Sequence, residues 1–213
     1  MSVKSPLPKG AQRPRGQTQR EGIGVLAAIV LLMWAIETIN TLDSNGLDRD
    51  GILARNVGHL WGIFTAPFIH ESYQHLISNT IPLAFLGLII ALRGAAWLAG
   101  VTLIVIVIGG IGTWLISPSG VSTIGASGLV FGYATYLLAR GVFDRSLLEL
   151  LTGVVVGALW GSVLLASLVP QGGISWQGHL SGAVGGVVAA YMLRRQRPQP
   201  GRPSRQPVGA LSK

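Results

Sequence analysis

The stretch AAWLAGVTLIVIVIGGIGTWLI, residues 95–116, contains no charged side chain. An α-helix of this length rises about 33 Å, at about 1.5 Å per residue, and the hydrocarbon core of a bilayer is about 30 Å thick. The whole chain of 213 residues shares this character, because 49% of its residues are hydrophobic and only 11% are charged. A typical soluble domain has about 25% charged residues. The sequence therefore predicts an integral membrane protein of one domain.

Composition also excludes several classes of protein. The chain has no cysteine, which excludes a disulfide-stapled scaffold, a thiolate metal site and a cysteine nucleophile. Its mean hydropathy of +0.54 and low charge are the opposite of what disordered chains show. Alternation with a period of two residues is absent, so the spans are predicted to be helices.

Five further apolar segments flank residues 95–116, and each is bounded by polar or turn residues. Together they predict an all-α membrane protein, a six-transmembrane-helix bundle occupying residues 22–195. A shorter apolar piece, LWGIFTAPFI at 60–69, is too short to span and is interpreted as interfacial or re-entrant. The other five predicted spans are residues 23–39, 75–92, 126–143, 147–169 and 178–193.

Positive charge gathers at the two ends of the chain. Of 16 Lys and Arg residues, eleven lie in the first or last 20 residues, and the net charge is +8. Residues 1–21 and 196–213 are predicted to be disordered basic tails that touch anionic membrane lipid. No nucleic-acid partner is expected, because no aromatic residues interleave these charges. Segments predicted to lie inside hold fourteen Lys and Arg against two outside, so both termini are expected in the cytoplasm.

With this topology, several unusual polar residues lie at a similar depth in the membrane, at the outer ends of three predicted helices. His75 and Asn79 begin the span 75–92, four residues apart and therefore on one helix face. Ser127 begins the span 126–143, and His179 begins the span 178–193. Ionisable residues within a membrane are costly and are functional by default.

Pairs of small residues predict that two of these helices cross closely. In each helix two glycines are four residues apart, and they lie beside Ser127 and His179. A close crossing would bring the serine hydroxyl and the imidazole within reach, which is the geometry of a nucleophile and its general base. The Ser127 N–H, at a helix N-terminus, could form an oxyanion hole with His75 and Asn79. The glycines are Gly128 and Gly132, and Gly182 and Gly186.

Residues 20–195 resemble the rhomboid family of intramembrane serine proteases, with the six-helix core common in bacteria. The resemblance rests on three motifs in order along the chain: His70-x4-His75-x3-Asn79, Gly125-Ala126-Ser127-Gly128, and His179-x2-Gly182-x3-Gly186. It implies a Ser127–His179 dyad without a third acid, and an oxyanion site formed by the Ser127 N–H, His75 and Asn79. It also implies cleavage of transmembrane protein substrates near the outer face of a bacterial cell membrane.

The chain departs from the family pattern at two informative positions. The family often has Trp-Arg in its first loop, where this chain has Trp61-Gly62. That difference puts the internal bonding of the loop in doubt. The residue four after the serine is often Tyr and here is Phe131, which keeps a ring to stack on the base but loses its hydroxyl.

Less specific interpretations remain open for single residues. Ser127 alone would be more typical of helix packing than of catalysis, and it is the combination with the two histidines and Asn79 that favours a nucleophile. His70 either shapes the site or lies at the membrane interface. A metal site is not favoured, because only Glu71 could complete a ligand set, so no metal and no cofactor are expected.

Two other functions compete with a protease. A non-catalytic rhomboid-like protein that binds client transmembrane segments is the main alternative, although intact Ser127 and His179 argue against it. A small transporter is less favoured, because the sequence shows no internal repeat and no polar path across the membrane. The identity of the substrate and the oligomeric state do not follow from the sequence.

Overall fold

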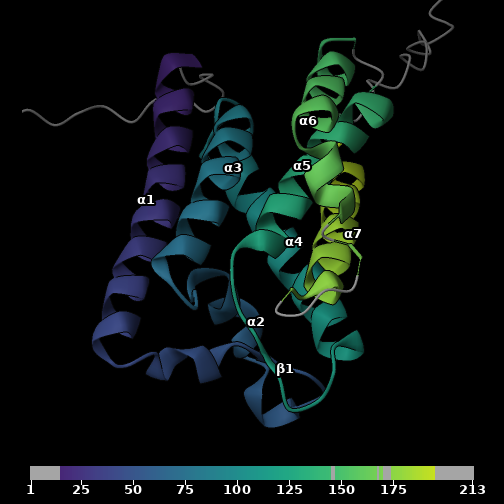
Figure 1. Cartoon of the computed structure of the whole chain (residues 1–213). Coiled ribbons are helices and arrows are strands. Elements are labelled where there is room, and N and C mark those ends of the chain that lie inside the picture. The colour runs from purple at the N-terminus through teal and green to yellow at the C-terminus, as the bar shows by residue number, and fades with distance from the viewer. Residues whose placement is uncertain (1–14, 145–146, 167, 170–173, 195–213) are drawn as a thin grey trace, which may run out of the picture.

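The computed structural model describes residues 15–144, 147–166, 168–169 and 174–194. Helices make up most of this part of the chain (Figure 1). The long helices are α1 (Arg15–Leu42), α3 (Tyr73–Ala91), α4 (Ala95–Ile116), α5 (Ser127–Asp144), α6 (Leu147–Ala166) and α7 (Trp176–Met192). The short elements are the 3-10 helices η1 (Gly46–Asp50), η2 (Val57–His59) and η3 (Ala66–Phe68), the helix α2 (Gly62–Thr65), and the strands β1 (Ile52–Leu53) and β2 (Ser122–Thr123).

Three helices in the described residues are long and apolar enough to cross a membrane: Gly16–Leu42, Tyr73–Ala91 and Ala95–Ile116. The helices α5, α6 and α7 occupy the positions of the other three predicted spans. The predicted helical membrane fold is therefore confirmed, whereas the total of six spans stays a prediction.

The first helix starts earlier than the sequence predicts. Helix α1 begins at Arg15, so residues 15–21, which were assigned to a disordered tail, are helical. A helix satisfies its backbone hydrogen bonds within itself, so polar side chains can also lie on it. Here Gln17 Nε2 donates to Glu21 Oε1, one turn later, at 3.0 Å. The rest of the two predicted tails, residues 1–14 and 196–213, lies outside the described residues.

The helices run up and down, so that α3, α5 and α7 all begin at the end where α2 and β1 lie (Figure 1). Helix α7 packs most extensively against α5 and α4, while α1 packs against α3 and α4. Helix α6 contacts the bundle chiefly through α5. Segments far apart in sequence, the starts of α3, α5 and α7, thus meet at one end of the bundle.

The connection between α1 and α3 is fastened to that end of the bundle. Its strand β1 pairs antiparallel with β2, with Ile52 opposite Thr123 and Leu53 opposite Ser122. The Arg55 guanidinium donates to the carbonyls of Leu115 and Ser117, at 2.9 Å each. The sequence predicted neither the small ribbon nor these bonds. They hold the connection against the C-terminus of α4 and against the segment that leads into Ser127.

Candidate active site

Ser127 is the first residue of α5 and follows a tightly held turn. Gly125 has φ +108°, a conformation that favours glycine, and its N–H donates to the Ala66 carbonyl at 2.9 Å. The N–H of Ala126 donates to Nε2 of His70 at 3.2 Å. The first amides of a helix lack partners inside the helix. The Ser127 N–H therefore stands at the positive end of α5, free of the helical hydrogen-bond ladder.

His179 lies in the first turn of α7 and contacts Ser127 directly. The Ser175 hydroxyl caps this helix by accepting from the Gly178 N–H at 3.2 Å. His179 is 7% exposed, and its Nε2 lies 2.9 Å from Ser127 Oγ. Phe131 stacks on the imidazole, with ring centroids 4.3 Å apart and planes 8° from parallel. With Nδ1 protonated, Nε2 is the acceptor for the serine hydroxyl.

Glycines allow the two helices to approach this closely. A side-chain carbon at Gly182 would overlap the Gly128 carbonyl, and one at Gly186 would overlap the Gly132 carbonyl and the Thr135 hydroxyl. Thr135 also donates across the interface to the Ala183 carbonyl at 2.8 Å. The crossing expected from the glycine spacing is therefore present, and it holds Ser127 against His179.

Helix α3 supplies the amide and the second imidazole. Ser72 caps it by accepting from the His75 N–H at 3.2 Å, and His75 and Asn79 lie one turn apart. A side-chain carbon at Gly125 would lie 2.8 Å from the His75 ring and 3.5 Å from Asn79 Nδ2. Asn79 is 5% exposed, and its Nδ2 has no hydrogen-bond partner among the described residues. Buried donors are normally bonded, so this one is a candidate donor to a bound group.

His70 lies in the connection that precedes α3 and is not part of that helix. It is fully buried, and its Nε2 accepts the N–H of Ala126, the residue before Ser127. That His70 shapes the site stays a prediction. Burial, and then the nearby His75, lower the pKa of His70 to about 4, against a weaker opposing effect of the Phe68 backbone. The ring is therefore neutral at neutral pH, as an acceptor nitrogen requires.

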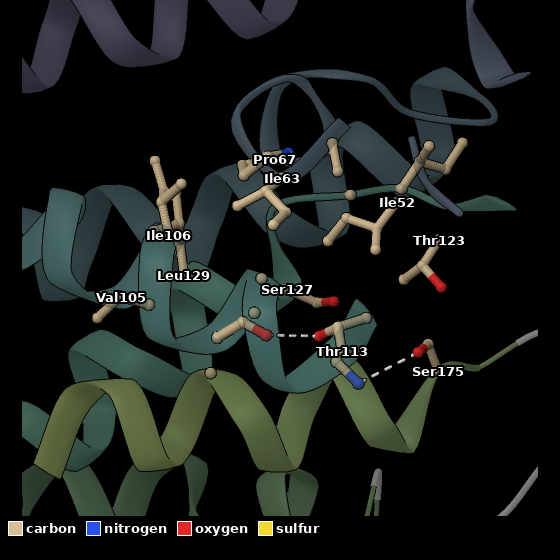
Figure 2. A pocket seen from close by; sticks show the side chains of 18 residues that line it. Ile52, Ile63, Pro67, Val105, Ile106, Thr113, Thr123, Ser127, Leu129 and Ser175 are labelled. Carbon is tan, nitrogen blue, oxygen red and sulfur yellow. Dashed lines mark hydrogen bonds between the residues drawn. The ribbon is translucent and has the colours of Figure 1, made fainter. Parts of the chain in front are cut away.

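A cavity of about 460 Å³, open solvent at its mouth included, lies beside the serine. Figure 2 shows Ser127 between Ile52 and Ile63 on one side and Thr113 and Ser175 on the other. The walls are mainly aliphatic side chains and glycines, so they suit an uncharged group. Within the part of the chain that the structure describes, no three His, Cys, Asp or Glu residues gather as metal ligands would.

Some residues that support the site were not found from the sequence. They are Asn40, which bonds the main chain of His70, the Ala66 carbonyl, and Ser175. A lone asparagine at the end of an apolar helix is a signal that could have pointed to Asn40, because buried amides need partners. The Ala66 carbonyl is a backbone group and leaves no such signal.

Comparison with known proteins identifies the family of the chain. The sequence profile of the Rhomboid domain matches residues 57–196. An uncharacterized protein of Mycobacterium tuberculosis is 41% identical over 198 residues, covering 89% of this chain and 81% of its own length. One from Mycobacterium leprae is 42% identical over 195 residues, covering 85% and 77%. The chloroplastic Rhomboid-like protein 11 of Arabidopsis thaliana is 31% identical over 153 residues, covering 62% and 51%. The chain belongs to the rhomboid family.

Proposed function

We propose that the protein is an intramembrane serine endopeptidase that cleaves transmembrane protein substrates through a Ser127–His179 dyad. The observation that carries this proposal is the 2.9 Å separation of Ser127 Oγ and His179 Nε2. A hydroxyl becomes nucleophilic when an adjacent base takes its proton. The cavity beside Ser127 offers room for a substrate group, which a purely structural serine would not need.

The reaction is an acyl transfer in two halves. His179 Nε2 takes the hydroxyl proton while Ser127 Oγ attacks the carbonyl carbon of the scissile peptide. The resulting oxyanion is stabilised by the Ser127 N–H, with His75 and Asn79 as side-chain donors. His179 then protonates the leaving amine, and a water molecule deprotonated by His179 releases the acyl group from Ser127.

Supporting residues keep these groups in place. Phe131 fixes the plane of the imidazole by stacking, and Gly125 leaves space for the His75 ring and Asn79. Gly128, Gly182 and Gly186 keep α5 and α7 in close contact. Holding the reacting groups in place in this way lowers the activation free energy of the chemical step by several kcal/mol, because less entropy is lost during the reaction.

We place the site at the outer end of six spans, with both chain termini in the cytoplasm. Arg93 follows the end of α3, and Arg140 lies near the C-terminal end of α5, opposite the end where α3, α5 and α7 begin; in the sequence Arg145 comes directly after α5. Positively charged segments favour the cytoplasmic side. Substrates are then cut near the external face of the cell membrane.

A cleavage assay tests this proposal. The purified protein is incubated in detergent with a model transmembrane substrate, beside Ser127→Ala and His179→Ala, and the cut is mapped by mass spectrometry. Cleavage by the wild type alone, near the outer end of the substrate, is the expected result. Equal cleavage in all three samples would contradict it, and stable substrate binding without any cleavage would favour a client-binding protein.

A further inference from the structure

Asn40 of α1 is far from Ser127 in the sequence, but hydrogen bonds connect it through His70 to the residue before the serine. Asn40 is fully buried near the C-terminus of α1. Its Nδ2 donates to Asp48 Oδ1 at 2.8 Å and to the His70 carbonyl at 3.0 Å. Its Oδ1 accepts the Leu47 N–H at 2.9 Å. One amide therefore joins α1, the following loop and the main chain of His70.

The bonds continue from His70 to the residue before the serine. His70 Nε2 accepts the Ala126 N–H at 3.2 Å, and the Ala126 carbonyl accepts the Val130 N–H at 3.0 Å. Ala126 is thus held at both of its backbone groups. Since the peptide plane between Ala126 and Ser127 includes the Ser127 N–H, these bonds set the direction of that N–H.

We propose that Asn40 is a positioning residue for the chemical step. By fixing the main chain of His70, it holds the His70 ring against Ala126 and so aims the Ser127 N–H at the oxyanion. Asn40 itself touches no reacting atom. This inference rests on the proposed peptidase function.

The physical case is that oxyanion donors act only when they are aimed in advance. Donors must be held to within about 0.5 Å of their productive position. A misplacement of about 1 Å can reduce the rate about a hundredfold. Loss of the Asn40 bond loosens His70 without removing any group from the site. The expected loss in kcat is therefore about ten- to a hundredfold, with KM little changed.

The test compares kcat, KM and the unfolding midpoint in several variants. Asn40→Asp removes the Nδ2 donor at constant size, and Asn40→Ala removes the amide without adding charge. Asn56→Asp makes the same chemical change at an exposed asparagine and is the matched control. At His70, Gln keeps an acceptor near the place of Nε2 and Leu does not. The expected results are a loss of kcat in Asn40→Asp, Asn40→Ala and His70→Leu, wild-type kcat in Asn56→Asp, and partial rescue in His70→Gln.

A double variant separates positioning from simple stability. If Asn40 acts through His70, then Asn40→Ala adds little to the loss in kcat caused by His70→Leu. Additive losses would overturn the proposal, as would wild-type kcat in Asn40 variants whose unfolding midpoint alone has fallen. Should the Asn40 variants fail to fold, equal activity of His70→Gln and His70→Leu would overturn it. Wild-type cleavage by Ser127→Ala would instead overturn the peptidase function itself.

Discussion

Helix α5 carries polar side chains at both of its ends, and the two groups are built differently. At its C-terminal end, Arg140 Nη2 lies 2.7 Å from Asp144 Oδ2, and Nη1 donates to the Tyr136 hydroxyl at 2.6 Å. The same guanidinium lies 4.9 Å from the centre of the Trp97 ring. At its N-terminal end, Ser127 meets His179 beside an open cavity.

The difference shows how an apolar bundle separates stability from chemistry. The Arg140 group pairs opposite charges whose side chains are 2% and 1% exposed. The Ser127 group contains a hydroxyl, imidazoles and an amide, and it leaves Asn79 Nδ2 without a partner among the described residues. Polar groups that bond one another stabilise the fold, whereas groups left unbonded beside a cavity can act on a third molecule.

The largest expected effect is on stability at the Arg140 end. Arg140→Leu leaves Asp144 buried without its cation, which we expect to lower the free energy of unfolding by about 3–5 kcal/mol. The double variant Arg140→Leu, Asp144→Leu should recover much of that loss, because no charge remains buried. Unfolding titrations with a denaturing detergent measure both, and kcat of the folded fraction should match the wild type. If Arg140→Leu lowered kcat as much as Ser127→Ala does, the view that the Arg140 end serves stability and the Ser127 end serves chemistry would be contradicted.

At the Ser127 end the effect should fall on rate and not on stability. Asn79→Ala removes a donor to the oxyanion, which we expect to lower kcat by about 10²–10³-fold. Its unfolding midpoint should stay near the wild-type value, because Nδ2 has no hydrogen bond to lose within the described residues. Substrate cleavage and unfolding are measured on the same preparation. Unchanged kcat with a lowered midpoint would make Asn79 a structural residue.

Acid should weaken the Ser127 end through His70. The pKa of His70 is about 4 in the folded protein, against an ordinary value of 6.5. Below about pH 6.5 the unfolded chain binds a proton that the folded protein does not, so stability falls until about pH 4 and then levels off. The full loss is about 3 kcal/mol. His70→Gln should abolish this part of the pH dependence of the unfolding midpoint, and identical curves for both proteins would contradict the buried neutral ring.

A smaller effect is expected where the two helices cross. Gly186→Ala places a methyl group against the Gly132 carbonyl and the Thr135 hydroxyl, at a cost of about 1–3 kcal/mol in stability. Because α5 and α7 must separate, kcat should fall as well. Gly24→Ala is the matched control, since apart from its own stretch of helix no atom of the described residues lies within 4 Å of the added carbon. Its free energy of unfolding should stay the same or rise by up to about 1 kcal/mol. Equal behaviour of the two variants would argue against the close crossing.

Helices were the part of the fold that the sequence predicted best. The span 95–116 coincides with α4, because Gly94, at φ +115°, ends the preceding turn and Pro118 follows the helix. The predicted starts of α5 and α7 were nearly right, because glycines and serines lie at the beginning of both helices. The start of α1 at Arg15 was missed, because polar residues outside a bilayer leave no apolar signal.

The site was predicted as a set of residues but not as a network. Ser127, His179, His75 and Asn79 stood out because polar side chains are rare in apolar helices. The bonds that hold them were hidden, because they join backbone groups to residues far away in sequence. No periodic sequence pattern predicts such contacts. Examples are the pairing of Ile52 with Thr123 and the bond of Asn40 to the His70 carbonyl.

Covalent labelling of Ser127 is the most direct test of the central claim, that this hydroxyl is activated by the His179 imidazole. The folded protein is treated with a fluorophosphonate probe, digested and analysed by mass spectrometry, beside His179→Ala and Gly24→Ala. We expect the probe on Ser127 in the wild type and in Gly24→Ala, and little or no label in His179→Ala. Equal labelling of His179→Ala, or label absent from Ser127 in folded wild-type protein, would contradict the claim.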